Sequence, residues 1–253
     1  MKNIFYTLYI VLSLFLFSSC NNESNKLSVF KTDSHYIQVK ADSLNPIDAE
    51  VEDIIKPYRE KMEKDMNKLV AFSEVELFKS KPSGTLNNAV SDMVLESLTE
   101  NTDFEIDFCV LNYGGLRRPL PKGKILKSDV FQLMPFQNEA VIVKVNADGM
   151  KNLFRYLYFS GGQPVSALKV SYRDSINFNA KIRNIEWDSS KSYWVLTSDY
   201  TANGGDKMNF FAQRDSVILT GILLRDAIFD YLEKLQEENI SLKADTVQRI
   251  IFE

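Results

Sequence analysis

Histidine is almost absent from this chain, and its scarcity excludes several kinds of catalytic site. The only histidine among the 253 residues is His35. A metal shell with several histidines cannot be built from these residues, because each imidazole ligand needs its own side chain. A catalytic cysteine would also need a nearby base, and one histidine offers almost none. We interpret His35 as a surface residue.

Positive charge is not in excess either. The chain carries 30 Lys and Arg against 34 Asp and Glu, which gives a net charge of −4 and an isoelectric point near 5.3. No basic stripe follows the sequence, so duplex nucleic acid is not an expected partner. An anionic ligand would have to be held by a few arginines or lysines at one site.

Only one long apolar run occurs, at residues 4–17, and it is shorter than a membrane span usually needs. It follows the basic Lys2 and precedes Ser18-Ser19-Cys20. These features predict a lipoprotein signal peptide over residues 1–19, with Cys20 as the lipidated first residue of the mature chain. The protein would then be a cell-envelope lipoprotein, membrane-anchored in the periplasm or at the outer surface. A simple secretory signal followed by an unrelated cysteine is the alternative.

Cysteine is also scarce, because only Cys109 remains after Cys20. A single thiol cannot form an intrachain disulfide. Cys109 lies in the apolar segment 106–111, so we interpret it as a small core residue of a strand.

Apolar periodicity predicts helices and strands that interleave along the chain. Helices are expected over residues 47–68, 85–98, 147–159 and 221–236, and a short one over 128–133 with Ser128 as its N-cap. Strands are expected over 70–78, 106–111, 140–145, 168–172 and 193–197. The order predicts an α+β fold in which a mixed β-sheet packs with helices. Residues 20–45 are interpreted as a tether and N-terminal arm, and residues 46–253 as one domain.

Three loop segments carry residues suited to binding a flat ring and a sugar. They contain Asn112-Tyr113-Gly114-Gly115-Leu116-Arg117, Pro135-Phe136-Gln137-Asn138, and Tyr200 followed by Gly204-Gly205-Asp206. Glycines let a backbone turn with positive φ and approach a ligand closely. An aromatic ring followed by Gly-Gly-Asp offers a stacking face and a carboxylate that accepts from vicinal hydroxyls.

Each candidate residue has a functional and a structural interpretation. Arg117 can bind an anion with two parallel hydrogen bonds, or it can be a surface arginine paired with a carboxylate. Phe136 and Tyr200 can stack on a base, at roughly 1–3 kcal/mol per base, or Phe136 can belong to the core. Asn138 can bond to the base edge, or it can be a turn residue.

Asp206 and Gly162 each have two interpretations as well. Asp206 can accept hydrogen bonds from ribose hydroxyls, or it can cap the segment that follows. Gly162, in the turn Ser160-Gly161-Gly162, can line the same pocket, or it can only end the preceding helix.

In order and approximate spacing, these loops resemble the C-terminal substrate-binding domain of the 5'-nucleotidase and UDP-sugar hydrolase family. The resemblance covers about residues 70–235 and implies a fold like that domain. It implies that Arg117 binds substrate, that Phe136 and Asn138 contact the base, and that Asp206 binds ribose. Tyr200 takes the place of the second stacking aromatic, which is commonly Phe in the family, and Gly162 is a weaker match.

The chain also departs from the family. The segment 79–88 lacks the Arg and Glu that the family carries there; Lys79 or Lys81 could replace a charge, but lysine lacks the bidentate fork. The family's N-terminal metallophosphoesterase domain binds two metals through several His, Asp and Asn residues, which one histidine cannot supply. We therefore expect no cofactor in this chain and place the divalent metals on a partner.

These observations predict the nucleotide- or nucleoside-recognition half of a 5'-nucleotidase-type phosphohydrolase. It would act in nucleotide catabolism with a separate metallophosphoesterase chain. The alternative is a non-catalytic lipoprotein of the cell envelope that binds nucleotides or nucleosides.

Overall fold

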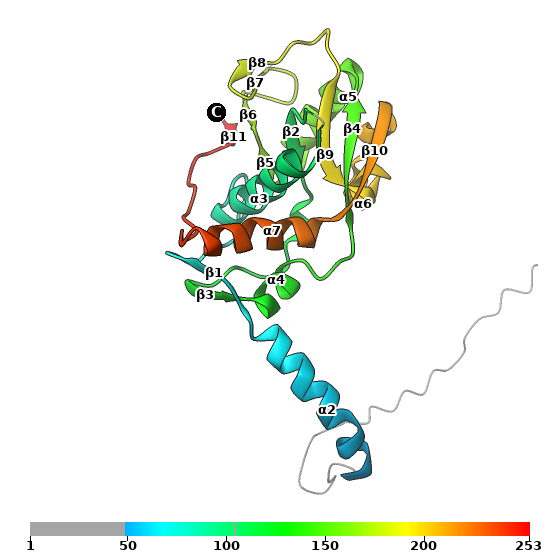
Figure 1. The fold of residues 1–253 in the computed structure, drawn as a ribbon. Coiled ribbons are helices and arrows are strands. Elements are labelled where there is room, and N and C mark those ends of the chain that lie inside the picture. Colours follow the sequence, from blue (N-terminus) through cyan, green and yellow to red (C-terminus); the bar gives the residue numbers. More distant parts are fainter. Residues whose placement is uncertain (1–48, 104) are drawn as a thin grey trace, which may run out of the picture. The chain divides into compact units, whose positions relative to one another are not determined.

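The structure is a computed structural model that describes residues 49–103 and 105–253 (Figure 1). The predictions for the signal peptide at 1–19, the lipidated Cys20, the arm at 20–45 and His35 lie outside the described residues. Within the described ranges, no helix is long and apolar enough to cross a membrane.

Helices and strands alternate irregularly along the described chain. The helices are α2 (Ala49–Met66), α3 (Thr85–Asn101), α4 (Lys127–Leu133), α5 (Ala147–Phe159), α6 (Asp199–Ala202) and α7 (Leu224–Glu237), with the 3-10 turns η1 (Tyr113–Gly115), η2 (Gly205–Lys207) and η3 (Asn209–Ala212). The strands are β1 (Leu69–Ser73), β2 (Phe108–Val110), β3 (Gly123–Leu126), β4 (Glu139–Val145), β5 (Val165–Ser166), β6 (Leu168–Tyr172), β7 (Phe178–Ile182), β8 (Ile185–Glu186), β9 (Tyr193–Ser198), β10 (Arg214–Leu223) and β11 (Ile250–Phe252).

The central sheet has the strand order β10-β4-β9-β2-β5. Strands β2 and β9 run parallel, and the other neighbours in this sheet are antiparallel. A second sheet has the order β11-β6-β7-β8, with one parallel pair, and β1 pairs with β3. The expected α+β fold with a mixed sheet is therefore confirmed.

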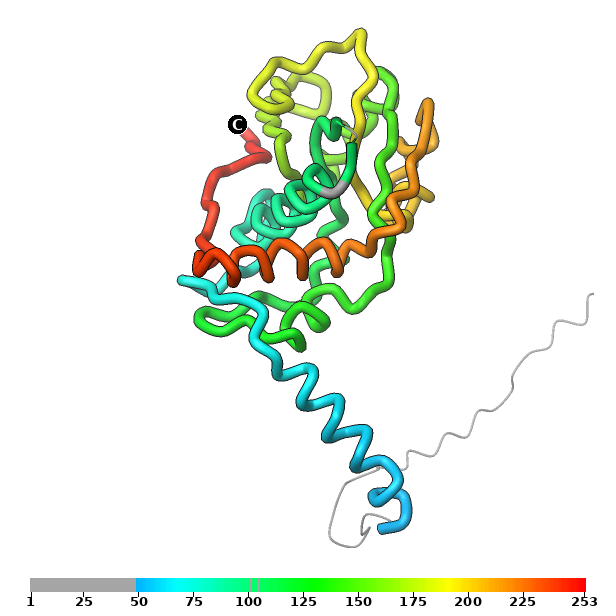
Figure 2. Tube along the Cα trace, viewed as in Figure 1, coloured from blue at the N-terminus to red at the C-terminus, as the bar shows by residue number. Residues whose placement is uncertain are grey.

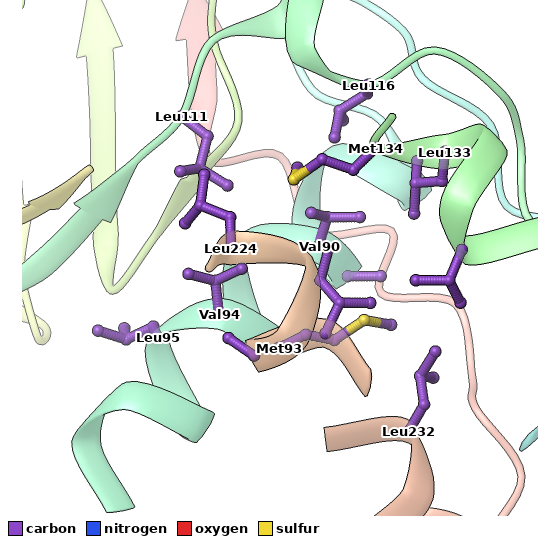
Figure 3. Close-up of a cluster of buried hydrophobic side chains, with 14 of the residues drawn as sticks. Val90, Met93, Val94, Leu95, Leu111, Leu116, Leu133, Met134, Leu224 and Leu232 are labelled. Atoms are coloured by element: carbon purple, nitrogen blue, oxygen red, sulfur yellow. The ribbon is translucent and has the colours of Figure 1, made fainter. Parts of the chain in front are cut away.

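The inner strands of the central sheet, β4, β9 and β2, are buried on both faces. Along β4, Ala140 and Ile142 pack into a core with α3 and α7, whereas Val141 and Val143 pack into a second core with α5. This is the alternation that a strand imposes, because successive side chains point to opposite faces. Helices α3 and α7 lie side by side over the first face (Figure 2). Val90, Met93 and Val94 from α3 gather near Leu224 and Leu232 from α7 (Figure 3).

Burial on both faces explains the almost unbroken apolar run at residues 106–111. Cys109 of β2 is fully buried, and burial raises the pKa of its thiol. The prediction that Cys109 is a core residue of a strand is confirmed.

Several predicted boundaries are wrong, each for a local reason. The strand expected over 70–78 ends at Ser73. Ser128 is not an N-cap, because α4 begins one residue earlier and the Asp129 carboxylate accepts from the Leu126 N–H at 2.7 Å. The helix expected from Gly221 begins at Leu224, because β10 continues to Leu223 with Gly221 at φ 72°.

Helix α2 forms where the periodicity predicts a helix, but no side chain of it is buried. Ile54, Tyr58 and Met62 are 62%, 76% and 59% exposed. Asp65 at its C-terminal end accepts from Lys127 of α4 at 2.7 Å. The apolar spacing therefore identified a helix without identifying a core position.

Candidate functional site

Five of the six predicted binding residues line one pocket. The pocket has a volume of about 300 Å³ and is lined by Asn112, Gly114, Arg117, Phe136, Asn138, Tyr200 and Asp206. Residues far apart in the sequence therefore meet at one place, as the three loop segments predicted.

The strand order explains why these loops meet. Because β2 and β9 are parallel neighbours, their carboxyl ends lie at the same edge of the sheet. The loop after β2 carries Arg117, and α6 and η2 after β9 carry Tyr200 and Asp206. Strand β4 runs antiparallel to β9, with Ala140 opposite Ser198, so the segment before β4 brings Phe136 and Asn138 to that edge.

The two candidate stacking aromatics are not core residues. Phe136 is 40% exposed and Tyr200 is 46% exposed, although both are large rings within a folded domain. A ring that lines a pocket and stays partly in water keeps apolar surface available to a ligand. The interpretation of Phe136 as a core residue is wrong.

Tyr200 is held by its neighbours as well as exposed. Its hydroxyl donates to Asp206 Oδ1 at 3.0 Å and accepts from the Asp206 N–H at 3.2 Å. Its ring lies directly against Gly205, where any Cβ would collide with the ring carbons. Glycine at position 205 therefore allows a close approach to the Tyr200 ring, whereas the close approach to a ligand stays a prediction.

Asp206 does not cap a helix. It lies inside η2 with φ 50° and ψ 28°, in the left-handed region that non-glycine residues seldom occupy. Its carboxylate accepts from Asn112 Nδ2 at 2.7 Å as well as from Tyr200. The carboxylate therefore joins the loop after β2 to the loop after β9.

Arg117 and Asn138 both line the pocket but differ in their exposure to solvent. The Arg117 N–H donates to the Leu133 carbonyl at 2.8 Å, and the residue is exposed. Among the described residues no carboxylate lies within ion-pair distance of its guanidinium, so its alternative interpretation as a paired surface arginine finds no partner there. Asn138 is half-buried, and its carbonyl accepts from the Leu224 N–H at 2.9 Å.

Gly162 lies outside the lining of this pocket. Its φ is 100°, and its N–H donates to the Leu157 carbonyl at 2.9 Å, which terminates α5. A Cβ at this position would collide with the backbone of Pro82. These contacts give Gly162 a structural role, and its proposed contact with substrate stays a prediction.

The two lysines considered as replacements for the missing arginine differ in position. Lys79 Nζ donates to the Leu116 carbonyl at 2.6 Å and to the Tyr113 carbonyl at 3.3 Å, and it lies 4.4 Å from the centre of the Tyr113 ring. Burial, and then the charge of Arg117, lowers the pKa of Lys79. Lys79 therefore holds the loop after β2. Lys81 donates to the Ser160 carbonyl and lines a neighbouring cavity.

That neighbouring cavity shares Gly114 and Asp206 with the pocket and has a volume of about 600 Å³. Its lining also includes Tyr156 and Gln163, which the sequence did not single out. Asn112 lines the pocket and donates to Asp206, a role that the sequence did not predict. The neighbouring pair Gly114-Gly115 could have pointed to Asn112 as a binding residue. No sequence motif points to Tyr156, which lies on the amphipathic helix α5, or to Gln163, which follows that helix.

No group of three or more His, Cys, Asp or Glu residues that could hold a metal ion occurs in the part of the chain that the structure describes. The pocket offers one carboxylate, one guanidinium, amide groups and two aromatic rings. These groups can bind a ligand by stacking, by hydrogen bonds and by charge.

Comparisons with known proteins identify relatives of this chain. It is 28% identical over 145 residues to protein UshA of Escherichia coli K12, and 22% identical over 191 residues to a 5'-nucleotidase of Vibrio vulnificus. These matches cover 54% and 72% of this chain but 26% and 34% of the relatives. The chain thus spans about a quarter to a third of their length.

Solved structures share the fold. The 5'-nucleotidase precursor of Thermus thermophilus superposes with a TM-score of 0.66 at 21% identity, over 79% of this chain and 42% of that one. The NAD nucleotidase of Haemophilus influenzae superposes with a TM-score of 0.62 at 13% identity, over 81% and 41%. A family model described as "5'-nucleotidase, C-terminal domain" matches residues 69–213, which is more than half of the chain. The chain therefore belongs to the 5'-nucleotidase C-terminal domain family.

Proposed function

We propose that this chain is the nucleotide- or nucleoside-recognition half of a 5'-nucleotidase-type phosphohydrolase, in which Phe136 and Tyr200 stack on the base. One observation carries the proposal: two partly exposed aromatic rings, an amide, a carboxylate and a guanidinium line one pocket of about 300 Å³. Few ligands other than a nucleotide combine a flat ring, vicinal hydroxyls and negative charge at this size.

Each residue has a task that fits its chemistry. The exposed faces of Phe136 and Tyr200 offer π surface to a purine or a pyrimidine, since every base has a π-face. Asn138 offers a donor and an acceptor to the base edge. The Asp206 carboxylate accepts from ribose hydroxyls, and Arg117 donates to the phosphate.

The hydrolytic step belongs, in this proposal, to a separate metallophosphoesterase chain. A metal-activated water and a metal clamp on the phosphate would supply the chemistry that these residues do not offer. The single histidine of the sequence supports it, because a metal shell with several imidazole ligands cannot be built from these residues.

Calorimetry with adenosine and AMP, followed by a nucleotidase assay, tests the proposal. The purified chain should bind both ligands, and AMP more tightly, because Arg117 contacts the phosphate. With Mg²⁺, Mn²⁺ or Zn²⁺ alone it should show no turnover, whereas a metallophosphoesterase chain that co-purifies with it should restore turnover. Turnover by the isolated chain would contradict the division of labour. Tight binding with no such partner would favour the binding-only lipoprotein.

We further propose that Cys20 is lipidated and anchors the protein to a membrane of the cell envelope. The motif Ser18-Ser19-Cys20 after an apolar run supports it. Cys20→Ser should leave the protein without lipid and unprocessed at this site, because the thioether needs the thiol; mass spectrometry of the N-terminus measures both. A variant that stays with the membranes after signal removal would contradict the anchor.

A further inference from the structure

The Asp206 carboxylate is already partly occupied by this chain's own donors. Asn112 Nδ2 donates to Oδ2 at 2.7 Å, and the Tyr200 hydroxyl donates to Oδ1 at 3.0 Å. An ionised carboxylate has about four acceptor sites, two on each oxygen. One acceptor site therefore remains on each oxygen, and the two protein donors decide where those sites point.

The backbone of Asp206 is held from the other side. Its φ of 50° is unfavourable for a residue with a Cβ and persists only where surrounding contacts hold it. The Tyr156 hydroxyl donates to the Asp206 carbonyl at 2.9 Å. Tyr156 in turn accepts from Gln163 Nε2 at 3.3 Å, and the buried Gln163 accepts from the Tyr113 N–H at 2.7 Å.

The hydrogen bonds thus form two connections between the loop after β2 and Asp206. One runs directly from Asn112 to the carboxylate, and the other runs from Tyr113 through Gln163 and Tyr156 to the carbonyl. Tyr200 adds the third fixed point, and it is also a wall of the pocket.

We propose that the Tyr200 hydroxyl, supported by Tyr156 and Gln163, is a positioning group that sets the Asp206 carboxylate to read the vicinal hydroxyls of a nucleoside. The inference rests on the proposed function and adds a second role to Tyr200. The ring recognises the base, and the hydroxyl makes recognition of the sugar depend on the same side chain. A phenylalanine at this position would keep the stacking face and lose the hold on Asp206.

Two ligands that differ only in the sugar hydroxyls separate these roles. Adenosine carries the vicinal pair, and 2',3'-dideoxyadenosine carries neither hydroxyl. Tyr200→Phe should weaken adenosine binding about five- to tenfold, which lies within the usual net worth of one ordinary hydrogen bond. Binding of the dideoxynucleoside should change by less than about twofold, because the stacking ring is intact.

Tyr156→Phe should give the same selective loss, and Tyr158→Phe is the matched control. Tyr158 lies on the same helix, and its hydroxyl makes no hydrogen bond within the described residues. The control variant should bind both ligands with the affinity of the wild type. If Tyr200→Phe does not fold, Tyr156→Phe decides the question in the same assay, with thermal unfolding as the check on the fold.

The outcomes are distinguishable. If the full-length wild-type chain binds neither ligand, the proposed function fails, and this inference fails with it. If the wild type binds adenosine and both hydroxyl deletions bind it equally well, the positioning role alone is overturned. An equal loss for the two ligands would also overturn it, because the hydroxyl would then act on the ring and not on the reading of the sugar.

Discussion

Aromatic side chains are used in two opposite ways in this domain. An interior aromatic cluster (Phe154, Tyr172, Phe178 and Trp187) lies between α5 and the second sheet, with ring centroids 5.0–6.0 Å apart. Phe154 and Tyr172 are buried. The pocket aromatics, Phe136 and Tyr200, stay 40% and 46% exposed. Packing of ring against ring thus accounts for the interior cluster, whereas the pocket aromatics leave much of their surface uncovered.

The two groups of rings contribute to different properties of the domain, one to stability and the other to binding. A buried ring contributes through the apolar area that it removes from water and through its neighbours. A partly exposed ring removes less area from water, so it contributes less to folding and keeps the rest of its surface for another molecule. Substitutions in the two groups should therefore change different quantities.

The largest effect is expected from Phe154→Ala. The substitution opens a cavity against Phe178 and Trp187, whose centroids both lie 5.0 Å away. It should lower the free energy of unfolding by about 3–5 kcal/mol, measured by urea denaturation. Ligand affinity of the molecules that remain folded should be unchanged. A loss of less than about 1 kcal/mol would show that the cluster is not a cohesive core.

Phe136→Ala should produce the converse result. We expect the free energy of unfolding to change by less than about 0.5 kcal/mol, as at ordinary surface sites, and the free energy of adenosine binding to fall by about 1–3 kcal/mol. Calorimetry and denaturation on the same sample measure both. Phe78→Ala is the matched control, because Phe78 is 57% exposed and lines neither cavity. If the Phe136 variant unfolds, Phe136 contributes mainly to stability, as the interior aromatic cluster does.

The two groups of aromatics also differ in what their tyrosine hydroxyls bind. The Tyr172 hydroxyl donates to the Phe154 carbonyl at 2.8 Å inside the core, whereas the Tyr200 hydroxyl donates to Asp206 at the pocket. Tyr172→Phe should cost about 1 kcal/mol of stability with no effect on adenosine binding. An effect on binding would mean that the core and the pocket are coupled.

The last expected effect is a dependence of stability on alkaline pH. Burial, and then the charges of Asp206 and Tyr200, raises the pKa of Tyr156 to about 12 from an ordinary value of 10. The fold therefore favours the neutral phenol. The resulting stabilisation is complete below about pH 10 and is lost as the pH rises from about 10 to about 12. Urea titrations at about pH 9 and about pH 11 should show a larger loss for the wild type than for Tyr156→Phe. Equal losses would contradict the shift.

Several features of this domain follow from local sequence alone. The alternating and helical apolar patterns predicted most helices and the central strands, because burial of one face imposes its period on the residues. The loop motifs predicted Arg117, Phe136, Asn138, Tyr200 and Asp206, and all five line one pocket. A loop motif that combines a glycine pair, an aromatic ring and a carboxylate can be recognised from a few neighbouring residues, without knowledge of the fold.

Other features depend on contacts between residues far apart in the chain, which a local pattern does not contain. Short strands such as β5, β8 and β11 carry too few residues to show a period, and β10 has no clear alternation of buried and exposed positions. Helix α2 has the spacing of a packed helix and buries no side chain. Asn112 and Asp206 are 94 positions apart, and only the parallel pairing of β2 with β9 places their loops at one edge. A hydrogen bond of that kind is set by strand order, which no local pattern encodes.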